Sequence, residues 1–157
     1  MPNFSLRSFS RSSRWLSLAL VGFILTAAQA HSANRVIKIS APASALPGTD
    51  ISVPVAVSTD AGGGEQIGFI HADFSTDGGK TWTGFCYAQN VGPSSKQFAN
   101  FKTGAAGSKS IVRVRVAFRG GKAGDVDFNG KTLDWSGTWE QWKGPPAKYI
   151  IIPVALP

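Results

Sequence analysis

Short runs in which apolar and polar side chains alternate dominate the chain after residue 34. In residues 110–118, three valines and a phenylalanine occupy every second position from 112 to 118, and Arg113 and Arg115 lie between them. Residues 51–58 have the same period, with an aliphatic side chain at positions 51, 53, 55 and 57. A period of two is typical of a β-strand with one buried face. No long window in this region has the period of a helix.

Clusters of Gly, Pro, Asp and Ser separate these runs and mark turns. The runs predict strands or hairpins over residues 35–40, 51–58, 67–75, 82–89, 95–104, 110–118, 126–133 and 147–155. Short strands with frequent turn signals favour an all-β fold of antiparallel strands. We therefore expect an immunoglobulin-like or fibronectin type III-like β-sandwich of seven to nine strands, preceded by a signal-peptide helix.

Two residues predict local departures from a regular ladder. Pro54 has no backbone N–H to donate, so we expect residues 51–58 to form an edge strand or to contain a bulge there. Asn129 and Gly130 both tolerate positive φ, so residues 126–133 are predicted to form a tight hairpin with a type I′ turn.

The first 30 residues have the composition of a secretory signal peptide. Residues 1–14 contain three arginines and no acid, residues 15–26 are mostly apolar, and Ala28-Gln29-Ala30 matches a signal peptidase site. The apolar run is shorter than the roughly 20 residues that span a bilayer. Cleavage after Ala30 would leave residues 31–157 as one exported domain, secreted or periplasmic, without a membrane span.

Charge and cysteine content narrow the function classes. The net charge of +7 becomes +4 once the three arginines of residues 1–14 are removed, and no run of like charge suggests a nucleic-acid partner. Cys86 is the single cysteine, so no disulfide within the chain can form. We expect Cys86 to be a buried core residue, with a disulfide-linked dimer as the alternative if it is exposed.

Residues 74–82, FSTDGGKTW, carry a recognisable hairpin motif. Their pattern resembles the Asp-box, Ser/Thr-x-Asp-x-Gly-x-Thr-Trp, whose defining positions are Ser75, Asp77, Gly79, Thr81 and Trp82. The resemblance implies a turn scaffold and not a catalytic site. We expect Asp77 to accept hydrogen bonds from the turn amides, and Ser75 and Thr81 to bond across the strands. A single box in a chain of this length is far too little for a sialidase propeller.

Residues 125–130 match the first half of a calcium-binding loop, with Asp125, Asp127 and Asn129 as candidate ligands. The twelfth loop position, which should supply a bidentate carboxylate, is Ser136. The alternative is an Asn-Gly hairpin with solvated aspartates, and we prefer it. Calcium is one of two cofactors that the sequence leaves open.

Copper is the second cofactor that the sequence leaves open. Cleavage after Ala30 makes His31 the N-terminal residue, and an N-terminal amine with its own imidazole and a second histidine, here His71, can hold copper. The alternative is that His71 is an ordinary strand residue. If residues 67–89 pair symmetrically about the Gly78-Gly79 turn, His71 lies opposite Cys86. That pair would lower the pKa of the thiol or form half of a metal site.

Three tryptophans lie close together in residues 134–146, DWSGTWEQWKGPP. Exposed indoles stack on sugar rings, and nearby acids bond hydroxyl groups, so the candidate ligand site consists of Trp135, Trp139, Trp142, Asp134 and Glu140. The spacing of three between the last two tryptophans equally suits a helical turn that covers one end of the sandwich.

No catalytic motif accompanies these features: the sequence has no G-x-S-x-G, H-E-x-x-H or phosphate loop. Arg113 and Arg115 form a basic stripe suited to an acidic glycan, a lipid headgroup or a partner protein, or simply a solvated strand face. We expect an exported, non-enzymatic binding module for a glycan or an envelope protein. The alternatives are a carbohydrate-binding module using the tryptophans and a small copper protein using His31. The oligomeric state stays open.

Overall fold

The computed structural model describes residues 34–133 and 145–156, and these residues form strands and no α-helix. Within them, no helix is long and apolar enough to cross a membrane. The strands are β1 (Arg35–Ile39), β2 (Asp50–Thr59), β3 (Gln66–Ser75), β4 (Thr83–Gln89), β5 (Ser94–Lys102), β6 (Lys109–Gly121), β7 (Gly124–Val126) and β8 (Lys148–Pro153).

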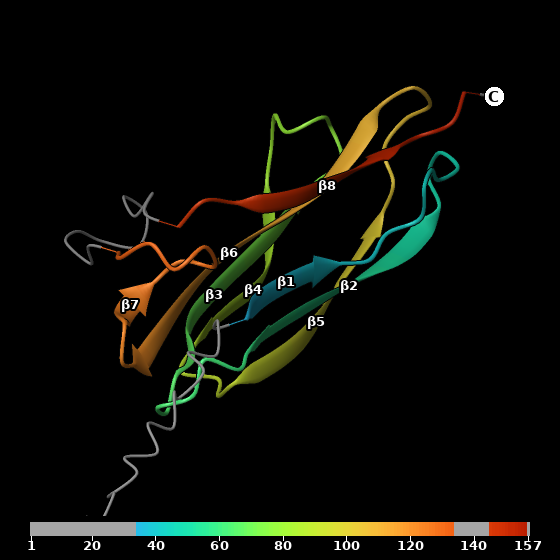
Figure 1. Ribbon diagram of the computed structural model, residues 1–157. Helices are drawn as coiled ribbons and strands as arrows, with labels where there is room; N and C mark the ends of the chain where they lie inside the picture. The colour runs from blue at the N-terminus through green and yellow to red at the C-terminus, as the bar shows by residue number, and fades with distance from the viewer. Residues whose placement is uncertain (1–33, 134–144, 157) are drawn as a thin grey trace, which may run out of the picture. The chain divides into compact units, whose positions relative to one another are not determined.

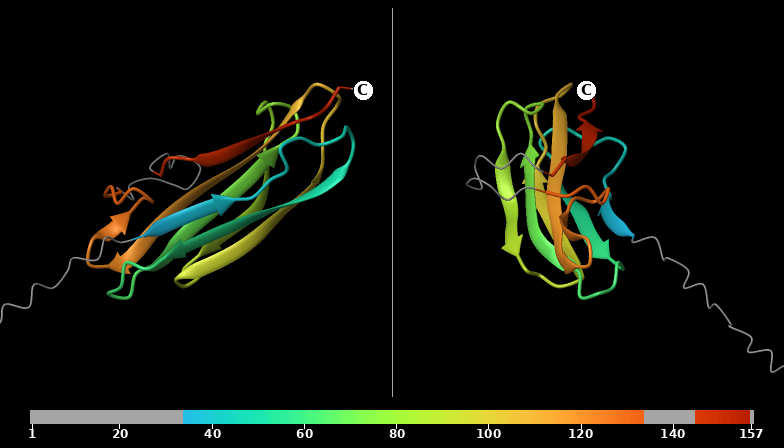
Figure 2. Two further views of the ribbon diagram at one scale, coloured as in Figure 1. Left: turned by 45° about the vertical axis from the view of Figure 1, so that its right-hand side comes forward. Right: turned by 60° about the vertical axis from the view of Figure 1, so that its left-hand side comes forward.

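The eight described strands form two antiparallel sheets that pack face to face (Figures 1 and 2). The smaller sheet has the order β1-β2-β5. In the larger sheet β4, β3 and β6 are neighbours, and β7 and β8 pair with different halves of the same β6 edge. The prediction of an all-β fold with antiparallel strands in a sandwich-like arrangement is confirmed.

The core lies between the two sheets and follows the alternation of the sequence. From β2 and β6 it takes fully or almost fully buried side chains at every second position, namely Val53, Val55, Val57, Val112, Val114, Val116 and Phe118. The rings of Phe74 and Phe101 stack between the sheets with centroids 4.6 Å apart. Burying a valine or phenylalanine contributes about 1.5–3 kcal/mol, so these alternating positions supply most of what holds the sheets together.

Pro54 lies in a central strand, because β2 pairs with β1 on one side and with β5 on the other. The prediction of an edge strand or a bulge at Pro54 is therefore wrong, since the register of β2 with both neighbours continues without a shift. The last paired residue of β1 is Ile39, opposite Val55, and Pro54 C=O accepts a hydrogen bond from Ser40 N–H just beyond that pair. The missing N–H of Pro54 thus points to the side where β1 ends, so little ladder bonding is lost.

The turn after β7 also differs from the prediction. Gly130 has φ of 80°, whereas Asn129 is not among the residues with positive φ, so the turn is not type I′. The N–H of Gly130 donates to Asp127 C=O, and the N–H of Asp127 donates to Lys131 C=O. A three-residue loop that ends in a left-handed glycine is the next commonest hairpin solution. The Asp127 carboxylate favours it, because it accepts bonds from the N–H groups of Asn129 and Lys131.

A buried ion pair fixes β1 to the loop before β3. The Arg35 guanidinium donates two hydrogen bonds, 2.8 and 2.6 Å, to the carboxylate of Glu65, whose side chain is fully buried. The Thr59 hydroxyl donates a third at 2.6 Å. Burial alone would raise the pKa of Glu65, but the bonds from Arg35 and Thr59 outweigh it and hold that pKa below its usual range. This pair is closed, with its charges satisfied inside the fold.

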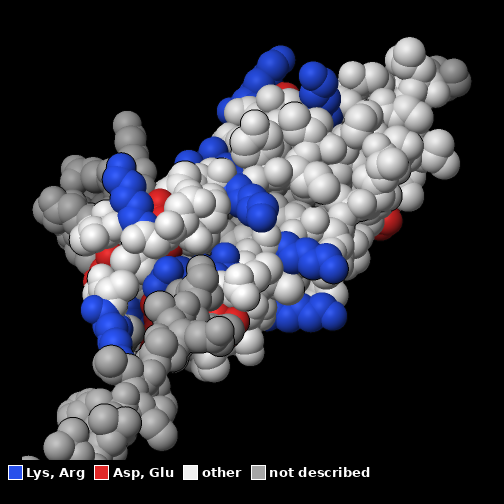
Figure 3. Space-filling view, in the orientation of Figure 1, with Lys and Arg blue, Asp and Glu red and all other residues white. Residues whose placement is uncertain are grey.

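The outer face of the smaller sheet carries exposed lysines. Lys38 and Lys96 flank Ala56 in one row across the three strands, and Lys102 lies near the end of β5. Figure 3 shows Lys and Arg side chains over these strands and few acidic ones. Phe98 of β5 is 49% exposed on the same face, with the Lys96 ammonium 5.2 Å from its ring centroid.

Candidate functional site

The turn between β3 and β4 is organised by the Asp77 carboxylate. Oδ1 accepts hydrogen bonds from the backbone N–H groups of Lys80 and Thr81, both 2.9 Å, and Oδ2 accepts the Thr81 hydroxyl at 2.7 Å. The Ser75 hydroxyl donates to Oδ1 at 2.7 Å and accepts from Gly79 N–H at 2.8 Å. Bonds from Thr81 and then Ser75 hold the pKa of Asp77 far below its usual range. Ser75 and Thr81 therefore meet through Asp77 and not across the strands.

The same turn positions Trp82. Its indole N–H donates to Gly79 C=O at 3.1 Å, which orients the ring over the larger sheet. The Arg113 guanidinium carbon lies 3.5 Å from the ring centroid, a cation–π contact. Arg113 also binds Asp73 through two hydrogen bonds of 2.7 and 2.8 Å. Trp82, the last residue of the Asp-box pattern, thus packs on Arg113 of β6.

These residues belong to the outer face of the larger sheet, by which we mean the side chains of its strands that point away from the core. Strand register arranges them in rows. Tyr87, His71 and Arg115 form one row, and Asp73, Arg113 and Tyr149 form the next. Other members include Phe69, Ala117, Ile111 and Ile151. The face therefore alternates charged and aromatic side chains over a few neighbouring strands.

Arg113 and Arg115 differ in their partners, although both point outward from β6. Both carboxylate oxygens of Asp73 accept bonds from Arg113. Arg115 has no ion-pair partner among the described residues. Burial first, and then the charge of Arg113, lower the pKa of Arg115. Among the described residues, Arg113 is bonded to a carboxylate, whereas Arg115 is partly buried near Asp73 without an ion pair to it.

A hollow of about 260 Å³ opens beside this unbalanced charge. Its lining consists of Trp82, Ile111, Arg113, Arg115, Ala147 and Tyr149. Tyr149 is 63% exposed, so its ring is available to a ligand. The hollow combines an aromatic wall, an aliphatic floor and a cation, the mixture typical of a binding site for a small group.

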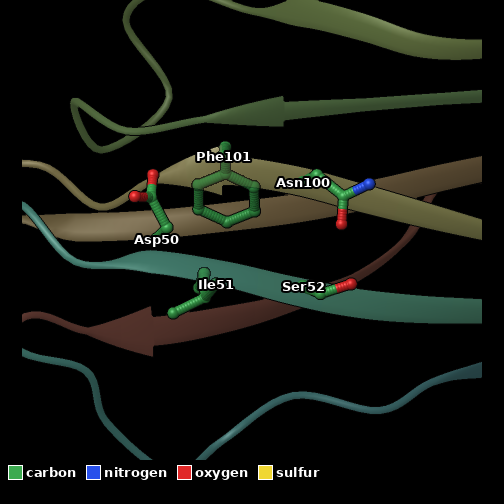
Figure 4. Close-up of a pocket in the computed structure, with 5 residues that line it drawn as sticks. All are labelled: Asp50, Ile51, Ser52, Asn100 and Phe101. Atoms are coloured by element: carbon green, nitrogen blue, oxygen red, sulfur yellow. The ribbon is translucent and has the colours of Figure 1, made fainter.

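Two other hollows have less distinctive chemistry. One, of about 410 Å³, lies at the end of the smaller sheet, and Figure 4 shows its five lining residues on β2 and β5. Two of these, Ile51 and Phe101, pack against the core, and the polar remainder has one charge, Asp50. The other, of about 470 Å³, lies beside the Asp77 turn and is lined mostly by small residues with Lys80 and Lys109. Neither places an unbalanced, partly buried charge against an exposed aromatic ring.

His71 does not pair with Cys86. His71 lies opposite Tyr87, and Ala72 lies opposite Cys86, because a bulge makes Phe85 an extra residue in β4. The prediction of a His71–Cys86 pair is wrong for this reason. Cys86 is buried in the core, where burial raises the pKa of its thiol.

The surroundings of His71 combine one carboxylate with two arginines. Its Nε2 lies 3.9 Å from Asp73 Oδ2, but Asp73 is already bonded to Arg113. Burial lowers the pKa of His71, Asp73 opposes this shift, and Arg115 and Arg113 add to it. Arg113 and Arg115 would repel a copper ion at His71, whereas Asp73 would attract it.

The candidate calcium ligands make other contacts. Asp125 Oδ2 lies 3.3 Å from a guanidinium nitrogen of Arg119. Asp127 is 2% exposed and its Oδ1 accepts two turn amides, one of them from Asn129. Across residues 34–133 and 145–156, no group of three or more His, Cys, Asp or Glu side chains is arranged to hold a metal ion.

The remaining predicted site residues lie outside the described residues. These are Asp134, Trp135, Trp139, Glu140, Trp142 and His31. The described residues that flank the tryptophan segment are informative. Leu133 is buried against Phe69 and Ala117 on the outer face of the larger sheet, and Ala147 lines the hollow. Leu133 and Ala147, which flank residues 134–146, therefore both lie at this face.

Sequence reasoning identified the arginines of this face but missed Asp73 and Tyr149. Asp73 alternates with core residues 72 and 74 in β3, so its outward direction could have been read from the sequence. Its pairing with Arg113 instead of Arg115 depends on the register between β3 and β6. Tyr149 lies in an apolar run, and the sequence does not reveal which of its side chains point toward the core.

Neither a scan of protein-family models nor a search of the curated proteins finds a match to this chain. The function is therefore inferred from the geometry and charge of the outer face.

Proposed function

We propose that this chain is an exported, non-enzymatic binding module whose ligand site is the outer face of the larger sheet. The observation that carries the proposal is the hollow in which Arg115, partly buried and without a carboxylate partner among the described residues, lies beside the exposed ring of Tyr149. A folded protein gains no stability from an unbalanced, partly desolvated charge, so a ligand is the natural reason for it.

The chemistry of this face favours binding over catalysis. A general acid or base must be able to exchange a proton with a substrate. Asp73 is buried, and both of its oxygens accept hydrogen bonds from Arg113, so it is poorly placed to exchange a proton with a substrate. Export is proposed on the sequence of residues 1–30, with its basic, apolar and small-residue segments in signal-peptide order.

The strand order supports a fibronectin type III-like fold within this proposal. The first, second and fifth strands form one sheet, and the third and sixth are neighbours in the other. Immunoglobulin-like sandwiches divide their strands in this way. In the fibronectin type III variant the fourth strand joins the sheet of the third, as β4 does here.

The test is binding to an array of immobilised neutral and acidic glycans and envelope proteins by the mature protein. Tyr149→Ala should weaken whatever binding is found by about tenfold or more, because it removes the aromatic wall. The matched control is Phe98→Ala, which removes an exposed aromatic side chain from the smaller sheet. The proposal fails if nothing binds, or if only Phe98→Ala reduces binding.

A carbohydrate-binding module that uses the tryptophan segment is the second candidate. The observation that favours it is the position of Leu133 and Ala147, which flank this segment, on the same outer face. Trp139→Ala and Trp142→Ala should then reduce glycan binding together with Tyr149→Ala. Glycan binding that persists unchanged in both tryptophan variants would remove this candidate and leave the hollow as the site.

A further inference from the structure

Among the described residues, the charges around the hollow leave one positive charge for a ligand. Two guanidinium groups, Arg113 and Arg115, line it, and one carboxylate, Asp73, lies beneath them. Asp73 uses both oxygens on Arg113, at 2.7 and 2.8 Å, and its side chain is 6% exposed. Arg115 has therefore no share in the hydrogen bonds of that carboxylate. A ligand group with a single negative charge would balance this face.

The hollow also limits the size and shape of that ligand. Its volume of about 260 Å³ is below the roughly 300–1,000 Å³ of sites for drug-sized molecules, so it suits one ring or side chain of a longer molecule. Tyr149 stands at its rim and is 63% exposed, and Ile151, 44% exposed, lies two residues along β8 on the same face. These side chains offer apolar surface to a flat ring, next to the guanidinium.

We propose that the hollow binds a carboxylated sugar ring of an acidic polysaccharide, with the carboxylate on Arg115 and the face of the ring on Tyr149. The inference rests on the proposed function and names its ligand class. A planar guanidinium matches a carboxylate in shape and charge. A phosphate monoester carries more charge than the one arginine left without an ion pair among the described residues neutralises, and a neutral sugar leaves that arginine unbalanced.

The experiment compares two forms of one glycan by calorimetry: an oligogalacturonate with free carboxylates, and the same oligomer with its carboxylates methyl-esterified. The wild-type protein should bind the free acid about tenfold or more tightly than the ester, because only the acid offers a charged partner for the guanidinium. Arg115→Gln should remove most of this preference. Because Arg115 makes no ion pair in the described structure, the variant should keep the wild-type circular dichroism spectrum and melting temperature.

Lys122→Gln is the matched control, because it removes one positive charge from an exposed turn of the same sheet, between β6 and β7. It should leave the affinity for the free acid within about twofold of wild type, as expected for the loss of a distant exposed charge. An equal loss in both variants would show attraction to net charge only and would overturn the proposal.

The other outcomes separate this inference from the proposed function. If the ester binds as well as the acid and Tyr149→Ala weakens the binding of both, the proposed binding face is supported. The proposal of an acidic ligand is then wrong. If polyglutamate or inorganic phosphate binds through Arg115 while the oligogalacturonate does not, the hollow binds an anion, and the proposal that its ligand is a carbohydrate is wrong. If none of these probes and no component of the glycan and protein array binds, both proposals fail.

Discussion

The two outer faces of the sandwich are both cationic, but they hold their charges differently. On the smaller sheet, Lys38, Lys96 and Lys102 are exposed, and their ammonium groups stay in water on long stems. On the larger sheet, Arg113 and Arg115 are partly buried, and only the first has a carboxylate partner among the described residues. The sign of the charge is the same on both faces, and only its solvation and pairing differ.

This difference teaches that net charge does not locate a site. A solvated lysine attracts anions weakly and without orientation, because water and salt screen it. A guanidinium that has lost part of its water gains more from a fixed partner. Of the two faces, we therefore assign ligand binding to the larger sheet, although the lysines of the smaller sheet are more exposed.

The largest expected effect comes from breaking the buried pair on the larger sheet. Arg113→Met leaves the Asp73 carboxylate buried without its cation, which should destabilise the fold by about 3 kcal/mol. Lys38→Met, on the smaller sheet, should change the free energy of unfolding by less than about 0.5 kcal/mol. Urea unfolding of both variants measures the two changes in the free energy of unfolding. Equal changes would contradict the contrast between the faces.

The Asp77 turn should have the next largest effect. Asp77→Ala removes the acceptor for the N–H groups of Lys80 and Thr81 and loosens the residues that orient Trp82. We expect a lower melting temperature and weaker ligand binding in Asp77→Ala, and neither change in the neighbouring variant Lys80→Ala. Differential scanning calorimetry checks the first expectation. Unchanged melting of Asp77→Ala would show that the turn does not depend on this carboxylate.

A smaller effect should appear on mild acidification. The pKa of His71 is lowered in the fold, so below about pH 6.5 the unfolded chain binds this proton more readily than the folded chain. Stability from the neutral imidazole is present above that pH and decreases as the pH falls toward the folded pKa. The slope from one group is at most about 1.4 kcal/mol per pH unit. His71→Gln should flatten the stability curve between pH 7 and about 5, and identical curves would contradict the assigned environment.

The smallest expected effect on stability is at Arg115. Since Arg115 makes no ion pair in the described structure and lies beside Arg113, Arg115→Gln should alter the free energy of unfolding by less than about 0.5 kcal/mol. The loss of unfolding free energy would then be several-fold larger in Arg113→Met than in Arg115→Gln, although both arginines lie on the same face of β6. Chemical unfolding of this variant alongside Arg113→Met provides the comparison. A large loss in Arg115→Gln would mean that this residue serves the fold and not a ligand.

Much of the fold was predictable because the alternation in β2 and β6 reports directly which positions are buried. The errors came from single residues that shift a register or select a turn. Phe85 forms a bulge that moves His71 away from Cys86, and the Asp127 carboxylate selects a three-residue loop over the type I′ turn. Pro54 is tolerated in a central strand because β1 stops beside it. None of these three features depends on the alternation of apolar and polar residues.

The candidate site was only half predictable. Alternation placed both arginines outward, but their inequality arises from the pairing of β3 with β6, which sets Asp73 opposite Arg113. Contacts between distant strands have no local signal in the sequence. The stacking of Trp82 on Arg113 likewise needs the completed sheet.

The most direct test of the account is a nuclear magnetic resonance titration of the isotope-labelled mature protein with the oligogalacturonate. The account predicts that the largest chemical-shift changes fall on the Trp82 indole N–H and on Arg115 and Tyr149, and that Arg115→Gln abolishes them. Changes centred instead on Lys38, Lys96 and Lys102 would place binding on the smaller sheet and contradict the account.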